Sequence, residues 1–146
     1  MDSKVILLVE DNPDDELITL MALRENHVFN QVVTAHDGEQ ALSYLLGDPA
    51  QPAQILRPLP QLVILDLGLP KVHGLEVLKA IRKNPHTHLL PVVTLTSSTQ
   101  EDDLVRSYAL GANSFIRKPL DHDQFVEAVR QLGLYWLLLN EPPPLV

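Results

Sequence analysis

The chain contains no cysteine among its 146 residues. Disulfide bridges, thiolate nucleophiles and Cys-ligated zinc sites are therefore excluded. Cations are also scarce, because 11 Lys and Arg stand against 19 Asp and Glu, which gives a formal net charge of −8. A surface that binds nucleic acid needs clustered cations to replace the counterions of the phosphates. We therefore expect no nucleic-acid partner.

Long apolar runs are missing as well. The run Val5–Val9 is too short for the core of a signal peptide, and nothing approaches the roughly 20 apolar residues of a membrane-spanning helix. No Gly-x-x-x-x-Gly-Lys-Ser/Thr motif occurs, which excludes a P-loop nucleotide site. The hydrophobic share of 45% is enough for a buried core in one domain. We expect a cytoplasmic protein with no membrane partner.

Short apolar runs alternate with longer amphipathic stretches along the chain. The runs predict five strands, at Val5–Val9, Gln31–Ala35, Leu62–Leu65, Pro91–Leu95 and Ser114–Arg117. The stretches between them predict five helices, which begin at Pro13, after Asp37-Gly38, near Gly74, at Gln100 and at Asp121. Asp48 to Pro60 holds four of the 12 prolines and predicts an irregular connection. This alternation indicates a parallel sheet with helices on both faces.

Chemically active side chains lie at the carboxyl ends of four of these predicted strands. They are Glu10 and Asp11 after the first strand, Asp66 after the third, Thr96 after the fourth and Lys118 after the fifth. Ligands of open parallel sheets bind just beyond the carboxyl ends of the strands, so we expect these side chains to form one site. Three carboxylates at one edge repel one another, and a hard divalent cation relieves that repulsion. The sequence therefore predicts a Mg²⁺ site.

The carboxylate of Asp66 has the chemistry for phosphoryl transfer. A carboxylate can act as a nucleophile toward phosphorus and form an acyl phosphate. The transferred group carries charge on its equatorial oxygens, which must be neutralised. Mg²⁺, the Lys118 ammonium and the Thr96 hydroxyl can each take one of these oxygens. We therefore predict that Asp66 accepts a phosphoryl group in a Mg²⁺-dependent reaction.

Four motifs occur in a fixed order at the strand ends. They are Val-Glu-Asp-Asn-Pro at 9–13, Asp-Leu-Gly-Leu-Pro-Lys-Val-His-Gly at 66–74, Thr96-Ser97, and Lys118-Pro119 after Phe115. With them, the chain resembles the receiver domains of two-component response regulators over about residues 4–139. The resemblance implies a flavodoxin-like, doubly wound, five-stranded parallel sheet of order 2-1-3-4-5 with five helices. We expect one receiver domain at 1–140, followed by a loose Pro-rich tail at 141–146.

The resemblance also implies a role for each residue of the site. Asp66 would accept phosphate from a histidine kinase or from a small phosphodonor. Asp11 and Asp66 would bind Mg²⁺, with Glu10 acting largely through water and the backbone carbonyl of Gly68 completing the shell. Lys118 and Thr96 would bind the phosphoryl group. Phe115 would swing inward as Thr96 is drawn to the phosphate, so that these two residues form the switch.

One departure from the family pattern lies beside the acceptor. The family often carries a polar side chain two residues after the phosphorylated Asp, where this chain has Gly68. Ser98, two residues after Thr96, is expected to line the same path of the hydrolytic water. We hypothesise that Gly68 and Ser98 set the lifetime of the acyl phosphate.

Alternatives remain for the reaction and for individual residues. An aspartyl phosphatase would share the carboxylates, the metal and the lysine, but it would normally carry a second Asp where this chain has Gly68. A pseudo-receiver that binds partners without phosphate is disfavoured because the motif residues are intact. We therefore favour a stoichiometric phosphoacceptor over an enzyme. The alternatives are that Thr96 caps the next helix and that Phe115 is a core residue, and the isomer of the Lys118-Pro119 bond stays open.

The last predicted helix, Asp121–Leu139, is apolar on every side near its end. Such a helix must be covered, either by its own domain or by a second copy of the chain. We favour a homodimer, with contacts from Leu134, Tyr135, Trp136 and Leu138. The Pro-rich connection and this helix resemble the single-domain regulators paired with phytochrome-type histidine kinases. That narrower resemblance implies a phytochrome as the kinase partner.

Overall fold

The computed structural model describes residues 5–25, 31–47, 59–69, 71–96, 108–112, 114–117, 123, 127–128 and 130–131. Its strands are β1 (Val5–Val9), β2 (Gln31–Ala35), β3 (Leu62–Asp66), β4 (Val92–Thr96) and β5 (Ser114–Arg117). Its helices are α1 (Pro13–Glu25), α2 (Gly38–Leu46) and α3 (Gly74–Lys83). Each of them overlaps a strand or helix that the sequence predicts, and β4 is displaced by one residue toward the carboxyl end.

Parts of the sequence-based prediction concern other segments. The predicted helices Gln100–Leu110 and Asp121–Leu139 lie mostly outside the described residues, as does most of the connection Asp48–Pro60, and the tail at 141–146 lies wholly outside them. None of the helices in the described part of the chain has the length and apolar character that a membrane crossing requires.

The strands pair in parallel to form one sheet, in the order β2-β1-β3-β4-β5. From β1 the chain moves to β2 on one side, and it then returns to place β3 on the other side of β1. The direction of winding therefore reverses between β1 and β3. In open parallel sheets this reversal is where ligands bind, at the carboxyl ends of the two strands. The parallel α/β class predicted from the sequence is confirmed.

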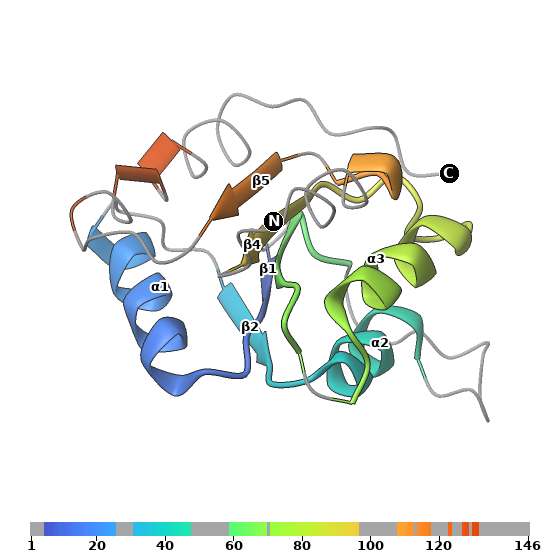
Figure 1. Ribbon diagram of the computed structural model, residues 1–146, viewed down its shortest axis with the longest axis horizontal. Coiled ribbons are helices and arrows are strands. Elements are labelled where there is room, and N and C mark those ends of the chain that lie inside the picture. The colour runs from blue at the N-terminus through green and yellow to red at the C-terminus, as the bar shows by residue number, and fades with distance from the viewer. Residues whose placement is uncertain are drawn as a thin grey trace.

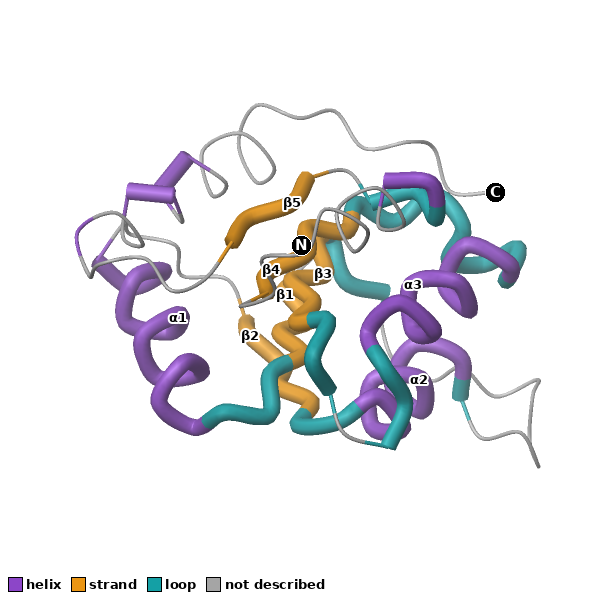
Figure 2. The backbone as a smooth tube through the Cα atoms, viewed as in Figure 1, coloured by secondary structure: helices purple, strands orange, loops and turns teal. Residues whose placement is uncertain are grey.

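Helices cover both faces of the sheet. Figure 1 shows α1 on one side of the strands and α2 with α3 on the other, and Figure 2 shows the strands as a layer between them. The core on the α2 and α3 side includes Leu7, Val9, Val77 and Leu78, and the core on the α1 side includes Ile6, Leu8, Ala22 and Leu23. Successive side chains of β1 therefore point to opposite cores. This double burial is why the strands are apolar throughout.

The buried face of α1 differs from the apolar spacing that predicts the helix. Leu17, Met21 and Leu23 recur at helical spacing, yet Leu17 and Met21 are 57% and 44% exposed and only Leu23 of the three is buried. The residues of α1 that are buried are Thr19, Ala22 and Leu23. Thr19 can be buried because its hydroxyl donates a hydrogen bond of 2.8 Å to the carbonyl of Asp15. Spacing thus identified the helix but not the side that faces the sheet.

Arg82 of α3 connects its helix to the segments that precede β4 and β5, at the amino ends of the strands. Its Nε donates to the carbonyl of Gly111 at 2.9 Å, and its Nη1 donates to the carbonyls of His88 and Leu90 at 3.1 and 2.8 Å. Gly111 has a φ of 93°, a conformation that favours glycine. A Cβ at that position would also lie 2.7 Å from Nε of Arg82. No motif predicts this contact, because the partners of Arg82 are backbone carbonyls.

Candidate functional site

Three carboxylates meet where the winding of the sheet reverses. Glu10, Asp11 and Asp66 each offer an oxygen, and these atoms lie within 4.8 Å of one another. The register explains the meeting, since β1 and β3 are neighbours and Val9 pairs with Leu65. The next residue on each strand therefore falls at the same edge. Glu10 is buried, Asp66 is half-buried and Asp11 is exposed.

The turn between β1 and α1 holds two of these acidic residues. The N–H of Glu10 donates to the carbonyl of Ala35 at 2.9 Å, which extends the pairing of β1 with β2 by one residue. Asn12 then caps α1, since its Oδ1 accepts from the N–H groups of Asp14 and Asp15 at 2.8 and 3.1 Å. Asp11 is therefore placed between the end of a strand and the start of a helix.

The carboxylates have the chemistry of a magnesium site. Mg²⁺ takes oxygen ligands and keeps several waters, so carboxylates with access to solvent suit it. Glu10 supplies a buried oxygen, while Asp11 and Asp66 are open enough to solvent for water to complete the coordination. Close carboxylates repel one another without a cation. Glu10, Asp11 and Asp66 are the residues that could hold the metal.

Asp66 is oriented by the loop that follows it. The N–H of Gly68 donates a hydrogen bond of 3.0 Å to Oδ1 of Asp66. Among the described residues, a Cβ added at Gly68 would meet only this same oxygen within contact range, at 3.8 Å. The glycine is itself exposed. Gly68 therefore holds the acceptor through its backbone, and no other described residue fills the space beside its Cα.

The loop between β3 and α3 is packed tightly behind the acceptor. The N–H of Gly74 donates to the carbonyl of Leu67 at 2.9 Å. A Cβ at Gly74 would lie 2.5 Å from the carbonyl oxygen of Asp66, so a larger residue cannot be placed there without a shift. His73 caps α3, and its Nδ1 accepts from the N–H of Leu75 at 3.1 Å. Glycine at 74 is thus required by the close approach of helix and strand.

Two further predicted site residues lie on neighbouring strands. Asp66 pairs with Leu95 across β3 and β4, so Thr96 ends β4 at the edge where the carboxylates meet. Phe115 lies in β5, where its backbone pairs with Thr94. Ser98 and Lys118 lie outside the described residues, as do the dimer candidates Leu134, Tyr135, Trp136 and Leu138. Their predicted roles stay predictions.

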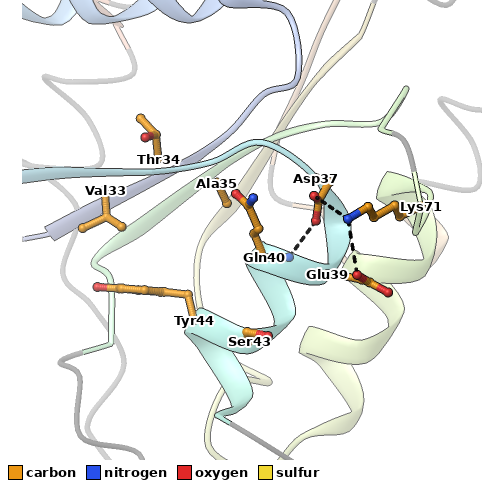
Figure 3. Close-up of a pocket in the computed structure, with 9 residues that line it drawn as sticks. All are labelled: Val33, Thr34, Ala35, Asp37, Glu39, Gln40, Ser43, Tyr44 and Lys71. Carbon is orange, nitrogen blue, oxygen red and sulfur yellow. Dashed lines mark hydrogen bonds and ion pairs between the residues drawn. The ribbon is translucent and has the colours of Figure 1, made fainter.

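One group of contacts beside the site was missed by the sequence analysis. Nζ of Lys71 lies 3.5 Å from Oδ2 of Asp37 and 3.7 Å from Oε2 of Glu39. Figure 3 shows Lys71 reaching from the loop after β3 toward the first turn of α2. These residues form one wall of a shallow pocket of about 410 Å³ between β2 and α2. The spacing of Asp37 and Lys71 in the sequence offers no signal for their contact.

Asp37 also caps α2. Its Oδ1 accepts from the N–H of Gln40 at 2.8 Å. This hydrogen bond, and after it the positive charge of Lys71, hold the pKa of Asp37 below its ordinary value, against the opposing effect of burial. The carboxylate is thus kept charged at the start of the helix, where the helix dipole favours a negative charge.

Known proteins resemble this chain in sequence over most of its length. The family model described as the response regulator receiver domain matches residues 6–130. The chain is 38% identical to a "Probable methanogenesis regulatory protein FilR2" from Methanothrix harundinacea, over 97% of this chain and 89% of that protein. It is 36% identical to the response regulator Rcp1 of Synechocystis, over 92% of this chain and 89% of that protein.

Solved structures agree with this match. The phosphorylated cyanobacterial phytochrome response regulator RcpA superposes with a TM-score of 0.86 at 37% identity, over 98% of this chain and 100% of RcpA. The Mn²⁺-bound form of Rcp1 superposes with a TM-score of 0.84 at 34% identity, over 97% of this chain and 99% of Rcp1. The similarity therefore spans the sheet, the helices and the edge that carries the carboxylates.

Proposed function

Since this chain belongs to the response regulator receiver family, we propose that it receives a phosphoryl group on Asp66 and uses the added charge as a signal. The observation that carries the proposal is the meeting of Glu10, Asp11 and Asp66 within 4.8 Å, at the winding reversal of a parallel sheet. Receiver domains carry phosphate on such an aspartate and take it from histidine kinases.

The transfer is a substitution at phosphorus. A carboxylate oxygen of Asp66 forms the new P–O bond while the bond from phosphorus to the donor breaks. That bond is P–N in a phosphohistidine and P–O in acetyl phosphate, and the leaving imidazole or acetate keeps the bonding electrons. The Gly68 N–H holds Oδ1 of Asp66, so the carboxylate is oriented before the donor arrives.

Other residues of the chain help to neutralise the negative charge of the carboxylates and of the transferred phosphoryl group. Glu10, Asp11 and Asp66, with the backbone carbonyl of Gly68, are the ligands we propose for Mg²⁺. When bound, the ion neutralises the carboxylates and the phosphoryl oxygens. Lys118 and Thr96 bind the remaining phosphoryl oxygens in this proposal.

The response to phosphorylation would arise on β4 and β5. Thr96 ends β4 and Phe115 lies in the adjacent β5. A movement of Thr96 would therefore take place beside the strand that carries Phe115. We propose that Thr96 and Phe115 together form the switch. Hydrolysis by water then restores Asp66, and Gly68 with Ser98 set its rate. The protein is modified once per signal and has no turnover substrate in this proposal.

The domain bounds, the kinase partner and the dimer are further proposals that build on the membership of the family. A single receiver domain at 1–140 with five helices would include the segments Gln100–Leu110 and Asp121–Leu139, followed by the tail at 141–146. We propose a phytochrome-type histidine kinase as the partner, supported by the similarity to RcpA and Rcp1 over nearly the whole chain. We further propose a homodimer through Leu134, Tyr135, Trp136 and Leu138.

Intact mass tests the acceptor. Wild type and Asp66→Asn are incubated with acetyl phosphate, with Mg²⁺ or with EDTA. The proposal requires that wild type with acetyl phosphate and Mg²⁺ gains the mass of one phosphoryl group. The EDTA sample and Asp66→Asn should gain none. Steady hydrolysis of a phosphoester by the wild type would instead favour an aspartyl phosphatase. For the kinase, phosphotransfer from a phytochrome kinase in its two light states is compared with transfer from an unrelated histidine kinase.

A further inference from the structure

Lys71 has an unusual backbone conformation beside the acceptor. Its φ is 65°, and among the described residues it is the one non-glycine residue with a positive φ. Residues other than glycine seldom adopt this region, and those that do are most often Asn, Asp or His. Residues held in such conformations cluster at functional sites. Lys71 follows Asp66 and Gly68 in the loop that returns to α3. The conformation therefore calls for a contact that stabilises it.

The contact is the bridge to the start of α2. Nζ of Lys71 lies 3.5 Å from Oδ2 of Asp37 and 3.7 Å from Oε2 of Glu39, as Figure 3 shows. The side chain of Asp37 is 9% exposed, and its other oxygen is engaged by the Gln40 N–H that caps the helix. One end of the bridge is therefore anchored in a rigid helix start.

The backbone on both sides of the bridge is in close contact with its surroundings. A Cβ added at Gly38 would lie 2.6 Å from Cβ of Val72, the residue after Lys71. A Cβ added at Gly74 would lie 2.5 Å from the carbonyl oxygen of Asp66. The loop is thus wedged between the first turn of α2 and the end of β3. A shift at Lys71 has little room to be absorbed before it reaches the acceptor.

We propose that Lys71 is a positioning residue for phosphorylation. Its ion pairs connect the acceptor loop, which is the loop between β3 and α3 that follows Asp66, to the first turn of α2. The inference rests on the proposed role of Asp66. Lys71 is 58% exposed, so its ion pairs contribute little to global stability. The effect of Lys71 falls instead on the placement of Asp66 and Gly68, and small displacements of reacting groups are costly.

Five variants separate this role from simpler explanations. Lys71→Met removes the charge and keeps the side-chain length, and Lys71→Arg restores the charge. Lys71→Gly accepts the positive φ without the bridge. Lys79→Met, at an exposed lysine on α3, is the control for the loss of one positive charge. Glu39→Gln weakens the bridge without touching the helix cap and stands in if Lys71→Met does not fold.

Two readouts are compared at a temperature where every variant is folded by circular dichroism. Calorimetry measures the affinity for Mn²⁺ alone, and single-turnover phosphorylation by acetyl phosphate measures the rate at saturating Mg²⁺. Lys71→Met should weaken Mn²⁺ binding or slow phosphorylation by about threefold to tenfold. Lys71→Arg should stay within about twofold of wild type, and Lys71→Gly should resemble Lys71→Met.

The outcomes discriminate between the two proposals. If wild type is phosphorylated and Lys71→Met matches Lys79→Met in both readouts, Lys71 has no positioning role. An equal loss in Lys71→Met and Lys79→Met would assign the effect to net charge and would equally overturn the inference. If wild type gains no phosphoryl group, the proposed function fails, and the Mn²⁺ titration still decides whether Lys71 shapes the metal site.

Discussion

The N–H of Gly68 donates a hydrogen bond of 3.0 Å to Oδ1 of Asp66. The residue that lacks a side chain beside the acceptor is therefore also the residue that orients it. A backbone donor survives any substitution except proline. The side chain at 68 can consequently change the surroundings of Asp66 without removing its hydrogen bond.

Exchanging Gly68 and Ser98 for larger polar residues is expected to change the rate of dephosphorylation by about tenfold, which corresponds to about 1.4 kcal/mol in the barrier. The physical reason is that the side chain at 68 would stand next to Oδ1 of Asp66, where the hydrolytic water must approach. The decay of phosphorylated protein is followed by phosphate-affinity electrophoresis. An unchanged rate in the double variant would show that these positions do not set the lifetime.

Replacing Asp11 by Asn is expected to weaken divalent-cation binding by about tenfold or more, because the cluster loses one of its negative charges. Mn²⁺ titration by calorimetry gives the affinity. Asp14→Asn is the matched control, since Asp14 lies in the first turn of α1 and its N–H is bonded to Asn12. Equal loss in both variants would indicate a general field effect of the acidic surface rather than ligation.

Replacing Arg82 by Met is expected to lower the free energy of unfolding by about 2–4 kcal/mol, because the carbonyls of His88, Leu90 and Gly111 lose a charged donor. Urea denaturation followed by circular dichroism measures the loss. Lys83→Met provides the comparison, as Lys83 is exposed at the end of the same helix. A loss no larger than that of Lys83→Met would mean that solvent replaces Arg82 without cost.

Stability at low pH should depend on Asp37. Its folded pKa is lowered from an ordinary value of 3.8, first by the Gln40 N–H and then by Lys71. A depressed acid pKa contributes stability that is fully present above the unfolded pKa and is lost as pH falls through the folded pKa. The stability gap between wild type and Asp37→Asn should therefore shrink on going from pH 6 to below pH 3.8. Urea midpoints at several pH values measure that gap, and a constant gap would contradict the assignment.

The proposed dimer predicts that Trp136→Ala and Leu138→Ala shift the protein toward the monomer. Both substitutions remove apolar area from the end of the predicted last helix. Light scattering coupled to size exclusion measures the mass of wild type and variants, with and without acetyl phosphate and Mg²⁺. If wild type is monomeric in both states, the dimer proposal is wrong and the apolar end of this helix is covered by its own domain.

Much of the architecture was determined by the sequence alone. Apolar runs such as Val5–Val9 and Leu62–Leu65 predict strands buried on both faces, because a solvent-facing side would require alternation. Strand ends then predict the acidic site, since parallel strands carry Glu10, Asp11 and Asp66 to one edge. These features depend on local pattern and on connectivity, which a sequence displays directly.

Tertiary structure decided which side chains meet beyond that edge. Leu17, Met21 and Leu23 mark a helix by their spacing, but only packing against the sheet decides that Leu23 is buried with Ala22 while Leu17 and Met21 are exposed. The partners of Arg82 are backbone carbonyls, which every residue possesses and no motif records. Asp37 and Lys71 lie far apart in the chain, and their contact exists because α2 and the acceptor loop lie side by side. Pairing of this kind depends on three-dimensional distance, which the order of residues does not specify.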